Sequence, residues 1–351
     1  MLREGADTQP VGSGVMWGRI VLLVGCAAAA LLVSAPGLFS LQRQLVFAQL
    51  IAFRGMLAIG FLVLGLVGAL LFWMLRRRAR TTRAVIGGLA AIALLAAGAN
   101  VTVQASRGFG ADATSGFATD AIDPATSIRI LTWNTYDTVS ADDIARVAVG
   151  EGATVLTLPE TSRETAEAVG RAMDAAGRPM QVFAAERGDP SATPPTALLV
   201  SEELGEYEVT DELGDTGAMP SVVARPADGT GPVIAAAHPM PPLPSIMSSW
   251  RSDVDWVLSF CDQPELVLGG DLNATLDHLG PLGGCSDALT EAGGGAEGSW
   301  PTSLPPLLAA PIDHVLTTGG WSAVEAHVLS TEDAAGSDHR PVVATLRIRA
   351  G

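Results

Sequence analysis

Residues 266–275 read LVLGGDLNAT, and residues 336–346 read GSDHRPVVATL. Each stretch combines a run of apolar, β-favouring residues with a compact group of Asp, Asn or His side chains. The apolar runs predict buried strands, and Asp271 and His339 lie beside the ends of those strands. Polar groups at strand ends occupy the position where binding and catalytic residues collect.

The same arrangement recurs along the chain. Polar residues gather just after other predicted strands: Asn134 after IRILTW, Glu160 after VLTLP, His238 after VIAAA, and Asp313 and His314 in PIDHVL. A single Asp or Asn in such a place is usually a turn or cap residue. Apolar runs that repeatedly end in carboxylate, amide or imidazole groups are a more specific signal, because solubility does not explain them. We therefore expect these side chains to meet at one rim of the folded domain.

Strand-like segments dominate the chain after residue 127. Predicted strands cover 128–133, 155–158, 181–184, 197–200, 207–210, 221–225, 233–237, 266–268, 312–316 and 342–348. Helical spacing occupies 141–150, 161–176 and 246–260. Because strands outnumber helices and the chain is long enough for two sheets, we expect an α/β domain over residues 128–351. Its predicted architecture is a two-layer β-sandwich flanked by helices.

Six short motifs carry a resemblance to a known family. They are TWN at 132–134, LPE at 158–160, AAAHP around His238, GGDLNAT at 269–275, IDHVL at 312–316 and GSDHRPV at 336–342. In this order they resemble the endonuclease/exonuclease/phosphatase superfamily, which includes DNase I-like nucleases, sphingomyelinases and inositol-phosphate phosphatases. The resemblance covers roughly residues 128–349 and is nearest to bacterial membrane-anchored members. It implies a DNase I-like fold and divalent-metal-dependent hydrolysis of a phosphoester, either a diester or a monoester.

The resemblance also implies a metal site. Glu160 is the expected ligand of Mg²⁺ or Mn²⁺, because hard cations favour carboxylate oxygen. Asn134 would support that ligand or bind the metal through its amide oxygen, and Asp338 is a possible second metal contact. Some relatives carry an acidic residue two positions after the Asn, where this chain has Tyr136 followed by Asp137. This departure leaves the occupancy of a second metal site open.

Catalytic roles follow from the same resemblance. Asp271 would orient or deprotonate the attacking water, and Asn273 would hold a phosphoryl oxygen. His238 would donate to the phosphate and stabilise the transition state. His339 is the candidate acid/base or phosphate-contacting group, and Asp313 would fix the tautomer of its ring.

Three apolar runs precede the predicted domain, and each is long enough to cross a bilayer. The loop RRRARTTR between the second and third runs is rich in arginine, and positive residues stay cytoplasmic. We therefore expect the catalytic domain outside the cytoplasm, with an inward-facing domain on two spans as the alternative. The predicted division is a cytoplasmic N-terminus at 1–16, an anchor at 17–105 with spans at about 17–39, 55–75 and 84–103, and a linker at 106–127.

Charge limits the choice of partner. Of the 37 acidic residues 35 lie after residue 105, together with 12 of the 21 arginines, so the soluble part carries a formal charge of about −23. Such a charge disfavours nucleic acid but not a phosphorylated small molecule or a lipid headgroup. The sequence leaves an extracellular nuclease and a non-catalytic sensing module open as alternatives.

The remaining features are less informative. An exported domain permits a disulfide between Cys261 and Cys285, and two buried free thiols fit the sequence equally well. We expect substrate specificity to depend on the loops at 185–196, 239–248 and 286–311. Trp300 and Trp321 are expected in the core, with contact to a ligand as the alternative.

Overall fold

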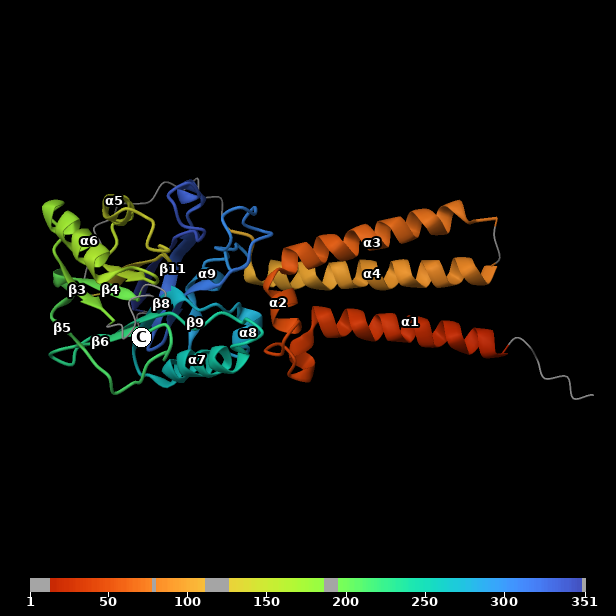
Figure 1. Ribbon diagram of the computed structural model, residues 1–351, viewed down its shortest axis with the longest axis horizontal. Coiled ribbons are helices and arrows are strands. Elements are labelled where there is room, and N and C mark those ends of the chain that lie inside the picture. Colours follow the sequence, from red (N-terminus) through yellow and green to blue (C-terminus); the bar gives the residue numbers. More distant parts are fainter. Residues whose placement is uncertain (1–12, 78–79, 111–125, 186–194, 349–351) are drawn as a thin grey trace, which may run out of the picture.

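The computed structural model describes residues 13–77, 80–110, 126–185 and 195–348. Three long helices lie side by side and extend from one end of a domain that contains all the strands (Figure 1). They are α1 (Ser13–Ser34), α3 (Arg54–Met74) and α4 (Arg80–Arg107). All three are long and apolar enough to cross a membrane. The short helix α2 (Phe47–Ala52) lies where they meet the domain (Figure 1).

The domain contains two six-stranded sheets. The first has the order β11-β12-β1-β2-β4-β3, with bounds Trp321–Val328, Val342–Ile348, Ser127–Thr132, Val155–Leu158, Ala197–Ser201 and Met180–Ala184. The second has the order β5-β6-β7-β8-β10-β9, with bounds Tyr207–Val209, Val222–Pro226, Val233–Ala237, Leu266–Asp271, Asp313–Thr317 and Ser286–Asp287. The expected α/β sandwich is therefore confirmed.

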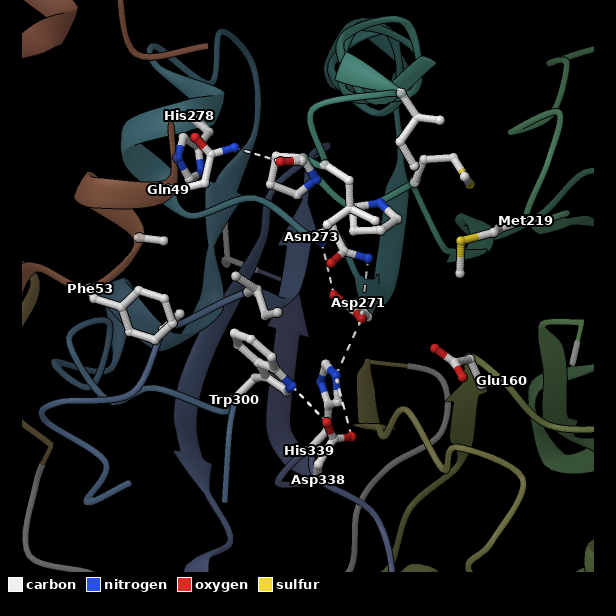
Figure 2. Close-up of a pocket in the computed structure, with 18 of the residues that line it drawn as sticks. Gln49, Phe53, Glu160, Met219, Asp271, Asn273, His278, Trp300, Asp338 and His339 are labelled. Atoms are coloured by element: carbon white, nitrogen blue, oxygen red, sulfur yellow. Dashed lines mark hydrogen bonds and ion pairs between the residues drawn. The ribbon is translucent and has the colours of Figure 1, made fainter. Parts of the chain in front are cut away.

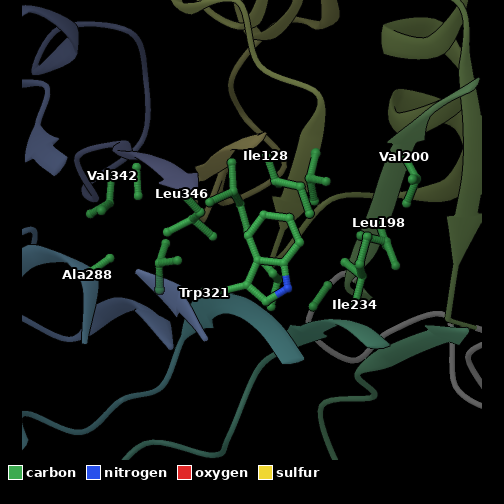
Figure 3. Packing of buried hydrophobic residues seen from close by; sticks show 14 of the residues in the cluster. Ile128, Leu198, Val200, Ile234, Ala288, Trp321, Val342 and Leu346 are labelled. Atoms are coloured by element: carbon green, nitrogen blue, oxygen red, sulfur yellow. The ribbon is translucent and has the colours of Figure 1, made fainter. Parts of the chain in front are cut away.

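Helices cover the outer faces of the two sheets. Helices α5 (Ala141–Glu151) and α6 (Arg163–Ala175) pack on the first sheet, and α7 (Met247–Ser259) packs on the second. The short helices α8 (Leu276–Leu279) and α9 (Ala288–Glu291) lie in the connections after β8 and β9. Apolar side chains from both sheets fill the space between the sheets, where Trp321 is also buried (Figure 3).

Strand β1 shows how the sequence specifies this arrangement. Ile128 and Ile130 point into the core between the sheets, while Leu131 packs under the outer helices. Successive side chains of a strand point to opposite faces, so a strand covered on both faces needs apolar residues on both, as at Ile130 and Leu131. The first outer helix begins where predicted, because the Ser140 side chain accepts a hydrogen bond from the Asp143 backbone N–H.

The strand pairing brings six chain positions to one rim. Strands β1 and β2 are parallel neighbours, as are β7 and β8, so each pair ends on one side of its sheet. The two pairs end on the same side, because the Asn134 amide after β1 donates to Asp271 at the end of β8. Strands β10 and β12 run antiparallel to β8 and β1 and therefore begin on that side. Asp313 is thus the first residue of β10, and His339 precedes β12. The expectation that Asp313 follows a strand is wrong. Both residues still reach the rim, because an antiparallel strand starts where its neighbour ends.

Two small residues allow the sheets to approach closely near the rim. A Cβ atom on Gly269 would collide with Thr157 and Ile130 of the opposite sheet. A Cβ atom on Gly270 would collide with the backbone of Ala237 on the neighbouring strand. The GGD sequence therefore brings the end of β8 close to the ends of β1, β2 and β7.

The anchor differs in detail from its predicted bounds. Helix α1 ends at Ser34, before the predicted end at residue 39, and a short 3-10 turn at Pro36–Phe39 follows. Helix α4 is longer than the predicted third span and includes the first two residues of the predicted linker. Most of that linker, 111–125, lies outside the described residues, as do the first twelve residues of the predicted cytoplasmic N-terminus.

Charged groups join the anchor to the domain. The Arg54 guanidinium donates to both carboxylate oxygens of Asp277, at 2.6 and 2.7 Å, and Arg107 binds the same carboxylate. Burial alone would raise the pKa of Asp277, but the two guanidinium groups outweigh it and lower the pKa to about 2. Helices α3 and α4 are thus joined to the domain by a largely buried cluster of opposite charges.

The open question about the cysteines is answered by the structure. Cys261 and Cys285 form a disulfide, with their Cα atoms 4.8 Å apart. The bond joins the turn after α7 to the segment that leads into β9, on the side of the second sheet away from the first.

Candidate functional site

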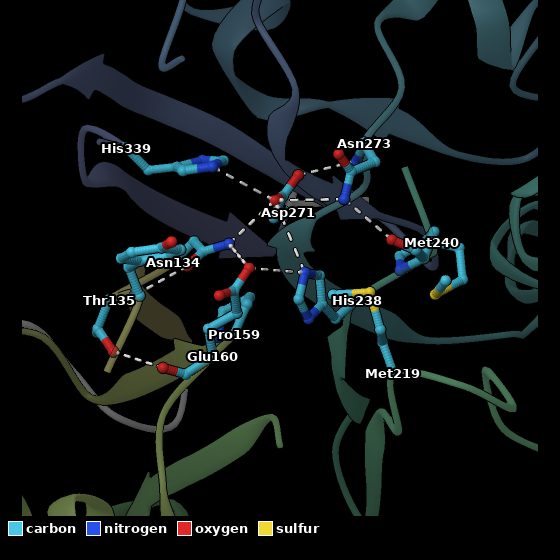
Figure 4. A network of polar contacts seen from close by, with 12 residues as sticks. Asn134, Thr135, Pro159, Glu160, Met219, His238, Met240, Asp271, Asn273 and His339 are labelled. Atoms are coloured by element: carbon cyan, nitrogen blue, oxygen red, sulfur yellow. Dashed lines mark hydrogen bonds and ion pairs between the residues drawn. The ribbon is translucent and has the colours of Figure 1, made fainter. Parts of the chain in front are cut away.

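Asp271 lies at the centre of the rim, at the end of β8 (Figure 4). Its Oδ1 atom accepts the Asn273 backbone N–H at 2.8 Å, and its Oδ2 atom accepts the Asn134 amide at 3.1 Å. The ring Nε2 atoms of His339 and His238 lie 3.6 and 3.8 Å from Oδ2. Burial raises the pKa of this carboxyl group, and His339 partly opposes the shift. Groups from the ends or starts of four strands, β1, β7, β8 and β12, therefore meet at one carboxylate.

Glu160 lies directly after β2 and faces the same point. Its Oε1 atom accepts the Asn134 amide at 3.0 Å and lies 3.7 Å from the His238 Nε2 atom. Its backbone φ is 50°, a left-handed conformation that residues other than glycine rarely adopt. Asn273 has a similar φ of 46°. Strained backbone of this kind clusters at functional sites, where the surrounding structure holds it in place.

Asn134 joins the two carboxylates. Its Nδ2 atom donates to both Glu160 and Asp271, while its Oδ1 atom accepts the Tyr136 backbone N–H at 3.0 Å. The amide nitrogen, not the oxygen, therefore faces the centre of the site. This arrangement fits the supporting role expected for Asn134 better than direct binding of a metal through its oxygen.

His238 is buried, and neither of its ring nitrogens has a hydrogen-bond partner among the described residues. Burial lowers the pKa of its ring to about 4, with the charge of Asp271 acting in the opposite direction. A buried imidazole without a partner is costly in a folded protein. Because Nε2 faces Glu160 and Asp271, the ring has an N–H group or a lone pair available for a ligand at that point.

His339 forms a pair with Asp313. The ring Nδ1 atom lies 2.9 Å from the Asp313 Oδ2 atom, and Nε2 points toward Asp271. Burial opposes protonation of the ring, but the charges of Asp313 and Asp271 outweigh it and raise the pKa of His339 to about 10. The other oxygen of Asp313, Oδ1, is buried without a hydrogen-bond partner. The contact with Asp313 holds the imidazole with Nε2 toward Asp271, and the catalytic role of the pair stays a prediction.

Asp338 and Asn273 lie at the edges of this cluster. Asp338 is half-exposed, and its Oδ2 atom accepts the Trp300 indole N–H at 2.8 Å. Its Oδ1 atom is 4.0 Å from the His339 ring. The Asn273 amide donates to the Pro239 carbonyl at 3.0 Å. The structure thus brings all eight predicted residues together, with Asp338 at the outer edge, and their individual roles remain predictions.

The donor groups of the site fit a divalent cation. Asp271, Asp313 and His339 present ligand atoms within 4.8 Å of one another, and Glu160 faces them across Asn134. Burial also raises the pKa of Glu160, and the charge of Asp271 adds to the shift. Several carboxylates that repel one another in a buried site are stabilised by a cation. Because Asp313 and His339 already bind each other, Glu160 and Asp271 are the better first ligands.

Asp137 does not supply the acidic group that is missing at position 136. Its Oδ1 atom accepts hydrogen bonds from the Ser162 backbone N–H and the Thr165 hydroxyl, at the start of α6. The exposed side chain of Tyr136 takes the place nearer to the site. The acidic residue next to Tyr136 is therefore engaged at the start of α6 and not in the site.

A cavity of about 570 Å³ opens beside the cluster (Figure 2). Glu160, Asp271 and His339 form part of its wall, and Trp300 forms another part. The expectation of a core position is thus met by Trp321 but not by Trp300. The wall also includes Phe53 from the anchor, which the sequence did not mark as part of a site.

His278 and His314 belong to the structure around the site and not to its centre. The His314 ring binds the Asp287 carboxylate at 2.8 Å. Burial alone would lower the pKa of His314, but the Asp287 carboxylate outweighs it and raises the pKa. The His278 ring accepts the Thr275 backbone N–H at 2.8 Å and lies 2.9 Å from the Ala48 carbonyl. Both rings therefore hold loops in place.

Comparison with known proteins agrees with this geometry. The family model described as "Endonuclease/Exonuclease/phosphatase family" matches residues 131–339. The chain is similar to the solved endonuclease/exonuclease/phosphatase from Beutenbergia cavernae DSM 12333, with 20% identity, a TM-score of 0.50, and 64% of this chain and 72% of that chain covered. It is also similar to D. rerio TDP2 humanized by 14 mutations, with 13% identity, a TM-score of 0.47, and 63% and 99% covered. No curated protein matches the chain.

Proposed function

Because the chain belongs to the endonuclease/exonuclease/phosphatase family, we propose that it is a membrane-anchored, divalent-metal-dependent hydrolase of phosphoesters. The observation that carries this proposal is the convergence of Asn134, Glu160, His238, Asp271, Asp313 and His339 on one rim. Such a set supplies what phosphoester hydrolysis requires: ligands for a cation, a group that orients water, and donors for phosphoryl oxygens.

Each side chain has a task that follows from its contacts. When bound, Mg²⁺ or Mn²⁺ would supply a Lewis acid that neutralises phosphoryl charge, held by Glu160 and Asp271. Asp271 is also placed to orient the attacking water, since burial strengthens it as a proton acceptor. Protonated His339 would donate from Nε2 to a phosphoryl oxygen, with Asp313 holding the ring. His238 would donate a second hydrogen bond from its unpartnered ring.

We also propose that the domain lies outside the cytoplasm. The arginine-rich segment predicted to be cytoplasmic includes Arg76 and Arg77 after α3, and Arg80 and Arg83 at the start of α4. These ends of α3 and α4 are far from the domain (Figure 1). If that segment stays cytoplasmic, the domain is on the opposite side of the membrane. The Cys261–Cys285 disulfide supports the same side, because disulfides persist in oxidising compartments.

The test uses the full chain in detergent micelles with bis(p-nitrophenyl) phosphate and p-nitrophenyl phosphate as substrates. We expect turnover of at least one of them with Mn²⁺ or Mg²⁺, and its loss with EDTA. Asp271→Asn should lower kcat by about a hundredfold or more, since it removes a group that acts in the transition state. Turnover that survives both EDTA and this substitution would refute the proposal.

A further inference from the structure

A segment of the anchor forms one wall of the candidate active site. Ala52 and Phe53, from the end of α2 and the position before α3, line the same cavity as Glu160 and Asp271 (Figure 2). The ring of Phe53 lies beside that of Trp300 at a tilt of 46°, with 5.9 Å between their centroids. The connection between the first two spans is therefore part of the site.

This wall is fixed to the domain by several contacts. The Gln49 amide donates to the Pro242 carbonyl, and the His278 ring lies 2.9 Å from the Ala48 carbonyl. Arg54, next to Phe53, binds Asp277 through two hydrogen bonds. At Gly55 a Cβ atom would collide with the backbone of Leu307, so the two parts are in close contact.

Away from the carboxylate cluster the cavity is mainly apolar. Its wall includes Phe53, Trp300, Leu243 and Ile246, and no arginine is among the described residues that line it. A polynucleotide needs cationic contacts for several phosphates. The cavity instead offers one phosphate site beside an apolar surface, which fits a molecule with a single phosphoester next to a hydrocarbon group.

The cavity also lies close to the predicted bilayer surface. Helix α1 ends at Ser34 and α3 begins at Arg54, so Phe53 directly precedes a span. Large apolar side chains on the connecting segment are exposed, with Leu38 at 73% and Val46 at 59%. Leu243, on the cavity wall, is exposed at 52%. Exposed apolar groups beside membrane spans are stabilised by contact with lipid.

From these observations, and resting on the proposed function, we infer that the substrate is a phosphoester lipid of the bilayer. Its phosphoryl group would bind the cation that Glu160 and Asp271 would hold. The first part of its hydrocarbon chain would lie along Phe53 and Trp300. The anchor would then determine specificity as well as location, because it supplies part of the surface that contacts the chain.

The test measures the binding of methyl-, butyl- and octylphosphonate to the full chain in nanodiscs with Mn²⁺, with titrations of empty nanodiscs subtracted. Phosphonates are not hydrolysed by this chemistry, so they report on the cavity even if no phosphoester is turned over. We expect the affinity to rise at least tenfold from methyl- to octylphosphonate, since each buried methylene adds apolar contact.

Two substitutions locate the binding surface. In Phe53→Ala and in Leu243→Ala, the affinity for octylphosphonate should exceed that for methylphosphonate by less than threefold. Phe109→Ala is the matched control, because Phe109 is 44% exposed and is not among the residues that line the cavity. Leu243 is half-exposed, so its truncation should leave the unfolding temperature unchanged and separate a binding effect from misfolding.

The outcomes are distinct. Equal affinity for all three phosphonates would overturn the inference, as would a rise in affinity with chain length that both variants retain. In either case hydrolysis of p-nitrophenyl esters would still support the proposed function. Tighter binding of a single-stranded oligonucleotide than of octylphosphonate would also overturn it. A chain-length gain that depends on Phe53, without hydrolysis of any ester, would support the lipid site and count against the enzyme.

Discussion

Replacing Asp277 by Asn removes the carboxylate that binds Arg54 and Arg107 but keeps its size. The pKa of Asp277 falls from an ordinary 3.8 to about 2 in the folded chain. One pKa unit corresponds to about 1.4 kcal/mol, so the charged form stabilises the fold by about 2 kcal/mol relative to a neutral group. The side chain of Asp277 is only 13% exposed, so solvent screening reduces this value little.

The assay is thermal unfolding of the full chain in detergent micelles, followed by tryptophan fluorescence. For a domain of this size 1 kcal/mol shifts Tm by roughly 2–4 °C, so Asp277→Asn should lower Tm by about 4–8 °C at pH 6. The matched control is Asp255→Asn, which removes the ion pair with Arg43. Asp255 is 68% exposed, and an exposed pair contributes little, so this variant should unfold within about 2 °C of the wild type.

The pH dependence tests the charge itself. Because the folded pKa of Asp277 is depressed, its contribution is complete above the unfolded value of 3.8 and is lost as the pH falls through about 2. The difference in unfolding free energy between the wild type and Asp277→Asn should therefore fall at pH 3 to roughly half of its value at pH 6. An equal Tm at pH 6, or a difference that is the same at pH 3 and pH 6, would refute the electrostatic explanation.

Three further outcomes follow from other parts of the structure. Asp313→Asn weakens the contact that orients the His339 ring, so kcat on p-nitrophenyl esters should fall by about tenfold or more. The Tm of this variant should stay within a few degrees of the wild type, and an unchanged kcat would contradict the expectation. Cys285→Ser opens a loop of 24 residues and should lower the unfolding free energy by about 3 kcal/mol in oxidising buffer; dithiothreitol should remove the difference from wild type. Gly269→Ala forces a methyl group against Thr157 and Ile130, and denaturant unfolding should show a loss of about 1–3 kcal/mol; a neutral effect would mean that the sheets can separate locally.

Much of the fold could be predicted because its strands are buried on both faces. Strands β2, β7 and β12 match their predicted bounds. Each is a mainly apolar run next to a proline or a polar residue: Pro159 follows β2, His238 follows β7 and Pro341 precedes β12. Strand β11 was missed. It lies at the edge of its sheet, and its sequence WSAVEAHV is only partly buried and includes the charged Glu325.

The site could be predicted as a set of residues but not as a shape. Short motifs specify Asn134, Glu160, Asp271 and His339 directly, because each follows or precedes a recognisable strand. The cavity wall at Phe53 depends on docking between segments about two hundred positions apart. The short, mostly apolar sequence of α2 gives no signal for that docking. Trp300 was misplaced for the same reason, since an indole in a core and one on a cavity wall have the same local sequence features.

The position of Asp277 has a consequence for how the anchor acts. Arg54 begins α3 and Arg107 ends α4, and a single carboxylate of the domain binds both. The domain is therefore fixed at the ends of two helices and is not held on a free tether. If these helices cross the membrane as we propose, the same contact would set the distance between the carboxylate cluster and the membrane surface, because Phe53 lies beside Arg54. A soluble fragment that begins at residue 107 would keep the cluster but lose this wall of the cavity, so it should retain metal-dependent chemistry and lose any preference for long hydrocarbon chains.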